Sequence, residues 1–305
     1  MPLQRVMTDF GSERSFAKAA RAVKEHHGII IPETAQRFFT LKHAKRIPTE
    51  AVVRTLPSDG TAKHIIAETD GSFVPIIAFK PGYGDKRKRR FKEHKEVRLC
   101  AAQAQGNTTN HYSNGGFGDV ERTGNAMAQS ALRAGWSSRS DVHCVGDGAP
   151  WIVNQVEKQF GKNRYLLDFY HLCQYLQPAA QSCCIDNPQQ WLKSKRELLK
   201  QNKPQEVLDA LSPHIEEQAL PDEIAPVRCA HRYIGNRLEQ LDYKTAIAKE
   251  LPIGSGIIES AHGHVIQDRI KKSGAAWELK NADAMISLRV LRANHISQWE
   301  NFWKN

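Results

Sequence analysis

Apolar residues first recur at helical spacing in residues 15–27, SFAKAARAVKEHH. Positions i, i+3, i+4 and i+7 form one face of that helix, occupied by Phe16, Ala19, Ala20 and Val23. A second helix is predicted over residues 34–47, and residues 47–62, with two prolines and a Ser-Asp-Gly turn, read as a linker. Two short helices with a basic second helix fit a helix-turn-helix DNA-binding unit and a plain helical hairpin equally well.

The pattern changes at residue 64, where β-rich segments replace the helical spacing. Strands are predicted over residues 64–79, 96–106, part of 107–118, 141–147 and 163–172, with helices over 119–135 and 149–161. The resulting order, β-β-β-α-β-α-β, indicates an α/β domain built on a mixed sheet. It is also the order of elements in ribonuclease-H-like nucleases.

Residues 173–250 lack convincing strands and are rich in Gln, Lys and Glu, which predicts a helical insertion. Two further helices are predicted over residues 256–274 and 281–303. We therefore predict four parts of the chain: a small helical DNA-binding segment with its linker over 1–60, the first part of a catalytic core over 61–172, an α-helical insertion over 173–250, and C-terminal helices that complete the core over 251–305.

Composition is that of an ordinary soluble globular protein, with 40% apolar and 25% charged residues among 305. No apolar run reaches about 18 residues, so no membrane span is expected. The N-terminus has no apolar segment typical of a secretory signal. The six cysteines lack the spacing of a disulfide framework, which favours a reduced, cytosolic protein.

The net charge of +10 favours a polyanionic partner, and nucleic acid is the commonest one. The charge is concentrated in KRKRRFKEHK, residues 86–95, where seven of ten positions are Lys or Arg. This run is either a solvated hairpin tip or a loop that contacts phosphates. We expect DNA contacts from its first five residues, Lys86, Arg87, Lys88, Arg89 and Arg90.

Three carboxylates fall at the places where ribonuclease-H-like nucleases hold theirs. Asp70 lies on the first predicted strand, Asp147 directly after the fourth, and Glu259 one turn into a late helix. Such carboxylates bind two Mg²⁺ ions about 4 Å apart, which activate the attacking hydroxyl and neutralise the leaving oxygen. Taken alone, an aspartate in an Asp-Gly pair more often forms a turn than binds a metal ion. Glu259 taken alone could be an exposed helix residue. Glu68, on the same strand face as Asp70, is the alternative first ligand.

Glycines surround two of these carboxylates. Gly146 and Gly148 flank Asp147, and we expect their small size to let a metal ion and the DNA backbone approach. The stretch PIGSGIIES before and through Glu259 matches neither a dinucleotide-binding loop nor a hydrolase nucleophile elbow, because the required flanking residues are missing. Its glycines are expected to permit a tight turn at the start of the helix.

Together, TDGSFVPI, VGDGAPWI with LLDFYHLCQYL, and LPIGSGIIESAHG with RIKKSGAAWELKNADAMISLRVLRAN resemble bacterial insertion-sequence transposases of the DDE class. The resemblance covers about residues 60–305 and points to the Kra group, related to the Mutator-like assemblage. It implies a ribonuclease-H-like catalytic domain with a helical insertion before the last catalytic residue. It also implies that Asp70, Asp147 and Glu259 bind Mg²⁺ or Mn²⁺, two ions in all. The activity would be metal-dependent cleavage at the element ends and strand transfer into target DNA.

The same resemblance implies further site residues. The DFYH motif suggests that Asp168 and His171 lie near the site, although a polar strand end with a satisfied histidine is the structural alternative. Residues after the catalytic glutamate would grip the DNA backbone and stack on an unpaired base, namely Arg269, Lys271, Lys272 and Trp277. Packing of Trp277 in the core is the alternative for that residue.

The implied partners are the terminal inverted repeats and target DNA, bound by at least a homodimer in the cytoplasm, at the bacterial nucleoid. Only about 60 residues precede the catalytic motifs, without a Cys/His zinc pattern. Either the two-helix segment reads the inverted repeats or this is a truncated copy.

Three other functions are alternatives for this sequence: a ribonuclease-H-like nuclease without strand transfer, a non-catalytic DNA-binding transposase remnant, and a zinc-binding protein. The zinc ligands would be Cys173, Cys183, Cys184 and Cys229 with His171 or His231, whose spacing is irregular.

Overall fold

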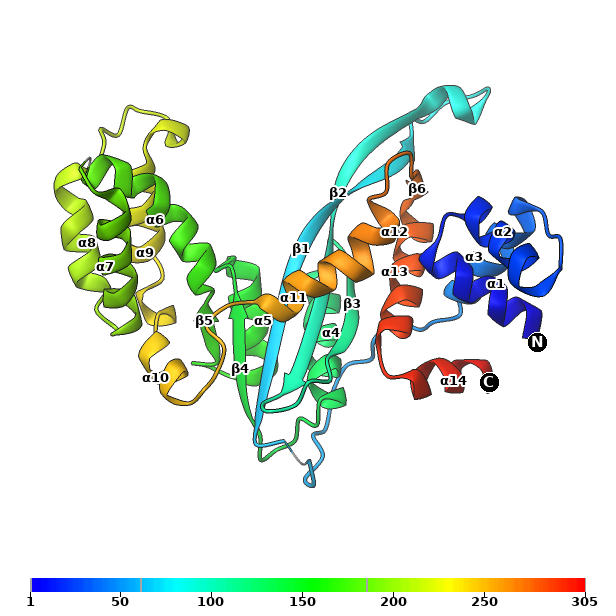
Figure 1. Ribbon diagram of the computed structural model, residues 1–305, viewed down its shortest axis with the longest axis horizontal. Coiled ribbons are helices and arrows are strands. Elements are labelled where there is room, and N and C mark those ends of the chain that lie inside the picture. Colours follow the sequence, from blue (N-terminus) through cyan, green and yellow to red (C-terminus); the bar gives the residue numbers. More distant parts are fainter. Residues whose placement is uncertain (1, 61, 185, 305) are drawn as a thin grey trace.

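The computed structural model describes residues 2–60, 62–184 and 186–304. A mixed sheet lies at its centre, with the strand order β3-β2-β1-β4-β5 (Figure 1). Its strands are β1 His64–Phe79, β2 Arg90–Ala104, β3 His111–Phe117, β4 Asp141–Gly146 and β5 Tyr165–Leu167. β2 runs antiparallel to both β1 and β3, whereas β4 is parallel to β1 and β5 is parallel to β4. The predicted mixed sheet in an α/β chain is therefore confirmed.

The two faces of the sheet follow the alternation of side chains along β1. Ile65 and Ala67 pack with Cys144 beneath α4 Val120–Arg133 and α5 Pro150–Phe160. Val74 and Ile76 belong to a second core on the opposite face, formed with the C-terminal helices. Even-numbered positions of β1, which include Asp70, therefore lie on the face that the C-terminal helices cover.

β1 and β2 are much longer than the strands beside them and extend beyond the sheet as a two-stranded arm. Their pairing continues from Ile65 opposite Ala104 to Phe79 opposite Arg90. A short 3₁₀ turn, Lys86–Arg89, closes the arm at its tip, at the upper right of Figure 1. The basic run thus lies on the tip of this hairpin and on the first residues of β2.

The fifth strand is shorter than the sequence pattern predicts. β5 ends at Leu167, and α6 Phe169–Cys183 begins where a strand over 163–172 was expected. Asp168 Oδ1 accepts a hydrogen bond of 2.9 Å from the His171 backbone N–H and caps this helix. The apolar run continues across the boundary because both the strand and the helix are buried.

Residues 173–250 form a helical unit at the left of Figure 1. It contains most of α6, then α7 Pro188–Lys200, α8 Pro204–Leu211, α9 Pro226–Gly235 and α10 Tyr243–Ala248. These helices enclose a core of their own, in which Leu172, Leu176 and Ile234 are fully buried. None of its described residues is in a strand.

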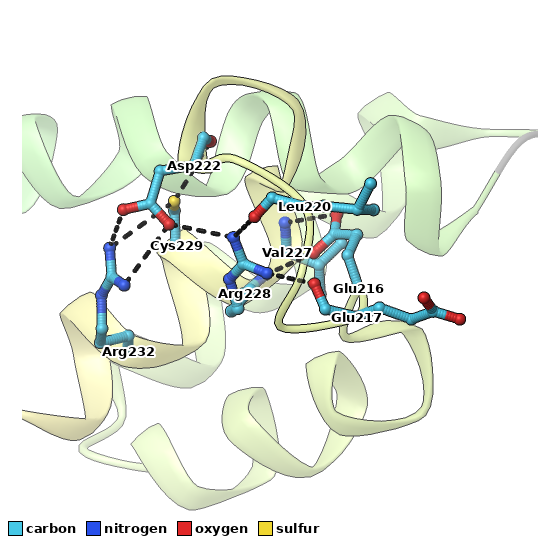
Figure 2. A network of polar contacts seen from close by, with 8 residues as sticks. All are labelled: Glu216, Glu217, Leu220, Asp222, Val227, Arg228, Cys229 and Arg232. Atoms are coloured by element: carbon cyan, nitrogen blue, oxygen red, sulfur yellow. Dashed lines mark hydrogen bonds and ion pairs between the residues drawn. The ribbon is translucent and has the colours of Figure 1, made fainter.

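A polar network attaches the long loop between α8 and α9 to the start of α9 (Figure 2). Asp222 accepts hydrogen bonds from Arg228 at 3.0 Å and Arg232 at 2.6 Å, and both guanidinium groups lower its pKa. Glu216 accepts from the backbone N–H groups of Val227 at 3.0 Å and Arg228 at 2.7 Å. Glu216 therefore satisfies two free N–H groups at the helix start.

Three helices form the N-terminal part: α1 Pro2–Glu13, α2 Phe16–His27 and α3 Glu33–Ala44. The sequence pattern did not predict α1, because its buried positions are Met7 and three small residues, Thr8, Gly11 and Ser12. A Cβ on Gly11 would lie 2.1 Å from Thr40 Oγ1, so α1 and α3 touch at this glycine. Leu41 of α3 packs in the same core as the C-terminal helices.

The C-terminal part returns to the sheet. α11 Gly256–Ala261 continues through a π-helical turn, His262–Gln267, into α12 Asp268–Ile270. β6 Trp277–Glu278 pairs with the far end of β1 and is followed by α13 Leu279–Ala293 and α14 Ile296–Lys304. The single helix predicted over 281–303 is thus two helices. Within the described residues, no helix has the length and apolar character that crossing a membrane requires.

Candidate active site

Asp70 lies on β1, and Asp147 directly follows the neighbouring parallel strand β4. The last residue pair between β1 and β4 joins Glu68 to Val145, and each aspartate follows two positions later. Side chains two positions apart on a strand share a face, and adjacent strands lie about 4.8 Å apart. The two aspartates therefore occupy the same level and the same face of the sheet.

Glu259 is brought to that face by α11, which crosses in front of β1 in Figure 1. The backbone N–H of Ile258 donates a hydrogen bond of 2.8 Å to Glu68 Oε2. Glu259 is the next residue and its side chain is exposed. The buried carboxyl of Glu68 thus fixes the helix that carries the third predicted carboxylate.

Asp168 provides a second attachment for the same helix. Its Oδ2 accepts a hydrogen bond of 2.7 Å from the Ser255 backbone N–H and another from the Ser255 hydroxyl, just before α11 begins. Its Oδ1 caps α6, as described above. Asp168 is only 2% exposed and holds the starts of α6 and α11 together.

Glu68, the alternative ligand, is a buried acid. It is 1% exposed, and burial raises its pKa to about 8, against the lowering effect of the Ile258 N–H group. Asp168 and Glu259 raise that pKa further. Among the described residues, its Oε1 has no hydrogen-bond partner. The raised pKa favours the neutral form of Glu68, whose carboxyl oxygen accepts from Ile258 and anchors α11.

The charge around Asp70 is uncompensated. Burial raises its pKa to about 6, the Gly71 N–H lowers it, and the carboxylates of Asp147 and Glu259 raise it again. His262 Nε2 lies 3.8 Å from Asp70 Oδ2, but burial lowers the pKa of this histidine to about 4, which keeps it neutral. In the part of the chain that the structure describes, no Lys or Arg forms an ion pair with any of the three predicted carboxylates.

This donor set matches the chemistry of a hard divalent cation, which prefers carboxylate oxygens. Across residues 2–60, 62–184 and 186–304, no three His, Cys, Asp or Glu side chains are close enough to hold an ion as they stand. Binding therefore requires a side chain to turn inward, and the exposed Glu259 has the room to do so. The same result provides no zinc site for the cysteine set.

The glycines beside Asp147 make room for protein side chains, and the predicted approach of a metal ion and the DNA backbone stays a prediction. A Cβ on Gly148, whose φ is +80°, would lie 2.4 Å from Arg237 Nε and 2.6 Å from Leu167 Cδ1. A Cβ on Gly146 would lie 2.9 Å from the Tyr165 hydroxyl. The close neighbours are thus residues that pack on the turn itself.

The turn after β4 is held by residues that the sequence did not single out. Tyr233 Oη donates a hydrogen bond of 2.6 Å to the Asp147 carbonyl oxygen. Arg237 donates two bonds of 3.2 Å to the Gly148 carbonyl, and the Gly148 N–H donates to Tyr165 Oη at 2.7 Å. Tyr233 lies in α9 and Arg237 just after it. The helical unit therefore binds the segment that carries Asp147 through these hydrogen bonds.

His171 lies beside Tyr233, which makes one of these hydrogen bonds. Its ring centroid is 6.0 Å from that of Tyr233, and Tyr233 stacks on Tyr175 at 3.9 Å. The predicted role of His171 near the site stays a prediction. Tyr233 is the residue that contacts both the His171 ring and the Asp147 carbonyl oxygen.

The residues predicted to bind DNA divide into two groups. Lys86, Arg87, Lys88 and Arg90 are exposed on the arm with Arg89 half-buried, and Lys271 and Lys272 are exposed after α12. Arg269 and Trp277, by contrast, are 4% and 5% exposed, which corrects their predicted contact with DNA. The Arg269 guanidinium lies between the rings of Phe16 and Trp277, 4.7 Å from each, and donates to the Gly11 carbonyl.

Comparisons with known proteins identify a family, but the description of that family names no activity. A model of the "Uncharacterised protein family (UPF0236)" matches residues 13–305. No curated protein matches the sequence. A solved structure, the "Drosophila P element transposase strand transfer complex", is similar over 98% of this chain and 79% of its own, with 10% identity and a TM-score of 0.33. Similarity at that level transfers neither fold nor activity.

Proposed function

We propose that this chain, which belongs to the uncharacterised protein family UPF0236, is a DNA transposase of the DDE class. The proposal is supported by the placement of Asp70 on β1, of Asp147 directly after the adjacent strand β4, and of Glu259 on α11, which crosses the sheet. These carboxylates raise the pKa of Asp70 and face no Lys or Arg ion-pair partner among the described residues. Uncompensated carboxylates at one place are the chemistry of a divalent cation site.

The topology supports the same proposal. The strand order β3-β2-β1-β4-β5, with β2 antiparallel and β4 parallel to β1, is the arrangement expected of a ribonuclease-H-like sheet. The helical unit over 173–250 lies between the second and third carboxylates, where the resemblance to Kra-group transposases places an insertion. We assign Asp70, Asp147 and Glu259 as the metal-binding catalytic residues.

Two Mg²⁺ or Mn²⁺ ions would supply hydroxyl activation and charge neutralisation at the scissile phosphate. The protein positions its ligands with different rigidity. Asp70 and Asp147 belong to paired strands or their immediate turn, whereas Glu259 depends on the anchors made by Glu68 and Asp168. The basic arm would bind the phosphate backbone of terminal inverted repeats and target DNA. Joint processing of two element ends would use at least two copies of the chain.

The test is metal-dependent cleavage of labelled duplex DNA that carries the flanks of the gene. We expect cleavage and joined products with Mg²⁺ or Mn²⁺, and a loss of at least about a hundredfold in Asp147→Asn, because metal ligation supplies several kcal/mol. Asp209→Asn, an exposed aspartate on α8, is the matched control. Wild-type cleavage by Asp147→Asn would overturn the assignment.

The products separate the two alternatives. Nicked DNA without joined products would assign a nuclease that lacks strand transfer. DNA binding without cleavage in either metal would assign a DNA-binding remnant of a transposase.

A further inference from the structure

A groove runs between the N-terminal helices and the β1–β2 arm, away from the carboxylates. It encloses about 790 Å³ and is lined by α2 and α3 on one side, by the arm on the other, and by the segment around β6. Ser15, Phe16 and Arg37 belong to the helical wall, and Phe79 and Arg90 to the arm. The groove therefore joins the two parts of the chain that the sequence marked separately as basic.

Its lining is strongly positive. Five exposed cations line it, namely Lys18, Arg37, Arg87, Arg90 and Lys272. Only two carboxylates line it, Glu33 and Glu278, and Glu278 pairs with Lys86 at 3.7 Å. Among the described residues, Arg87 pairs with Asp85, while the other four cations have no acidic partner. Such an excess of unpaired cations attracts a polyanion.

The walls are joined by a rigid floor. Arg269 lies between Phe16 of α2 and Trp277 of β6, and it also donates to the Gly11 carbonyl. β6 in turn pairs with β1, Ile76 opposite Trp277. The helices and the arm therefore keep their spacing without a ligand, which lowers the entropy cost of binding a stiff partner.

The aromatic side chains of the groove are already covered by cations. Trp277 and Phe16 face the Arg269 guanidinium, and Phe79 lies 4.0 Å from the Lys86 ammonium. Single-stranded nucleic acid is bound by stacking its bases on open aromatic faces. A cation therefore already lies over each of these three rings, which favours binding of a duplex backbone by charge over stacking of bases.

We propose that this groove binds the phosphate backbone of duplex DNA about one helical turn from the carboxylates. The proposal rests on the proposed function, because the DNA bound here is the DNA cleaved there. Phe79 lies nine positions beyond Asp70 on the same strand, a distance of at most about 30 Å. One turn of B-DNA measures about 34–36 Å, or about ten base pairs. A duplex along the arm would thus present phosphates to both places at once.

Duplex binding in a salt series tests the groove. We expect the double substitution Lys18→Gln with Arg37→Gln to weaken binding of a 30-base-pair fluorescent duplex. Each lost phosphate contact should reduce the slope of log K against log salt by about 0.9, or about 1.8 for the pair. Lys24→Gln, an exposed lysine of α2 outside the groove, is the matched control and should keep both values. Thermal melting checks that the variants fold, since both substituted side chains are exposed.

Duplex length gives a second measurement. On substrates with fewer than about eight base pairs on the arm side of the cleavage point, wild type and the double variant should cleave equally. On longer substrates the wild type should gain affinity and the double variant should not. Unchanged salt slope and affinity in the double variant would overturn the proposal, as would tighter binding of single-stranded DNA or of duplex RNA than of duplex DNA.

The experiments distinguish failure of the catalytic proposal from failure of the groove proposal. Asp147→Asn should abolish cleavage and keep the wild-type salt slope. If wild type never cleaves but the groove variant loses the slope, the catalytic proposal fails and the groove stands. If cleavage depends on Asp147 but the groove variant binds normally, the groove proposal alone is wrong.

Discussion

Tyr233 and Asp147 are 86 positions apart in the sequence, and a 2.6 Å hydrogen bond joins the tyrosine hydroxyl to the aspartate carbonyl oxygen. Tyr233 belongs to the helical unit and Asp147 follows a strand of the sheet. The position of one predicted metal ligand therefore depends on a helix outside the sheet.

Tyr233→Phe removes this bond and keeps the ring. We expect a stability loss of about 1 kcal/mol, the usual net value of such a bond. We also expect the Mg²⁺ concentration for half-maximal cleavage to rise, because the Asp147 turn is held less firmly. Tyr170→Phe, on a side chain that is 63% exposed, serves as control. A stability loss with an unchanged Mg²⁺ requirement would show that the bond does not position the ligand.

Glu68 makes stability depend on pH. Its carboxyl keeps a proton up to about pH 8 when folded, against an ordinary pKa of 4.5. The folded chain therefore binds more protons between these values, and the free energy of unfolding falls as pH rises from about 4.5 to about 8. Glu68→Gln keeps an oxygen acceptor for Ile258 and has no titrating proton. We expect its stability to fall less over that interval, by a difference of a few kcal/mol.

Urea unfolding at pH 5, 6.5 and 8 in a chelator measures this difference. Glu223→Gln, an exposed acid in the helical unit, is the control. Parallel stability curves for wild type and Glu68→Gln would mean that Glu68 ionises normally.

Gly148→Ala tests the contact between the helical unit and the turn. The new Cβ would meet Arg237 and Leu167 in addition to an unfavourable positive φ, so we expect a loss of more than about 1 kcal/mol. Gly161→Ala shares a positive φ of +91° but meets no described heavy atom within 4 Å. The difference in unfolding free energy between the two variants isolates the clash. Equal losses would mean that backbone strain alone sets the cost.

Arg269 and Lys272 separate folding from DNA binding. Arg269→Gln removes a buried cation from between two rings, and we expect a stability loss of a few kcal/mol. Lys272→Gln should change stability by less than about 0.5 kcal/mol and reduce the salt slope by about 0.9. Chemical unfolding and duplex titration measure the two effects. A reduced slope in a fully folded Arg269→Gln protein would restore the predicted DNA contact of Arg269.

The strands and the positions of the carboxylates were predictable because their signals are local. Alternation along residues 64–79 predicts a strand with Asp70 on one face, and Asp147 follows a short apolar run that ends in a turn. Parallel pairing then brings the two aspartates to the same level. The order of elements, read from the same local patterns, was sufficient to predict a mixed sheet.

What the sequence did not indicate depends on contacts between distant segments. Arg269 and Lys272 are both basic residues after the third carboxylate, yet only Arg269 is enclosed, because Phe16 of a distant helix covers it. Glu68 and Asp70 share a strand face, but α11 covers Glu68 and leaves Asp70 partly open. The spacing of residues along the chain does not predict which distant segment will pack against a given side chain.

The bond between Ile258 and Glu68 spans 190 positions. During synthesis from the N-terminus, Asp70 and Asp147 emerge well before α11 does. A nascent chain that has not yet released α11 holds two of the three carboxylates and lacks the contact that would place the third. The proposed site is therefore complete only after α11 has been synthesised and Ile258 bonds to Glu68.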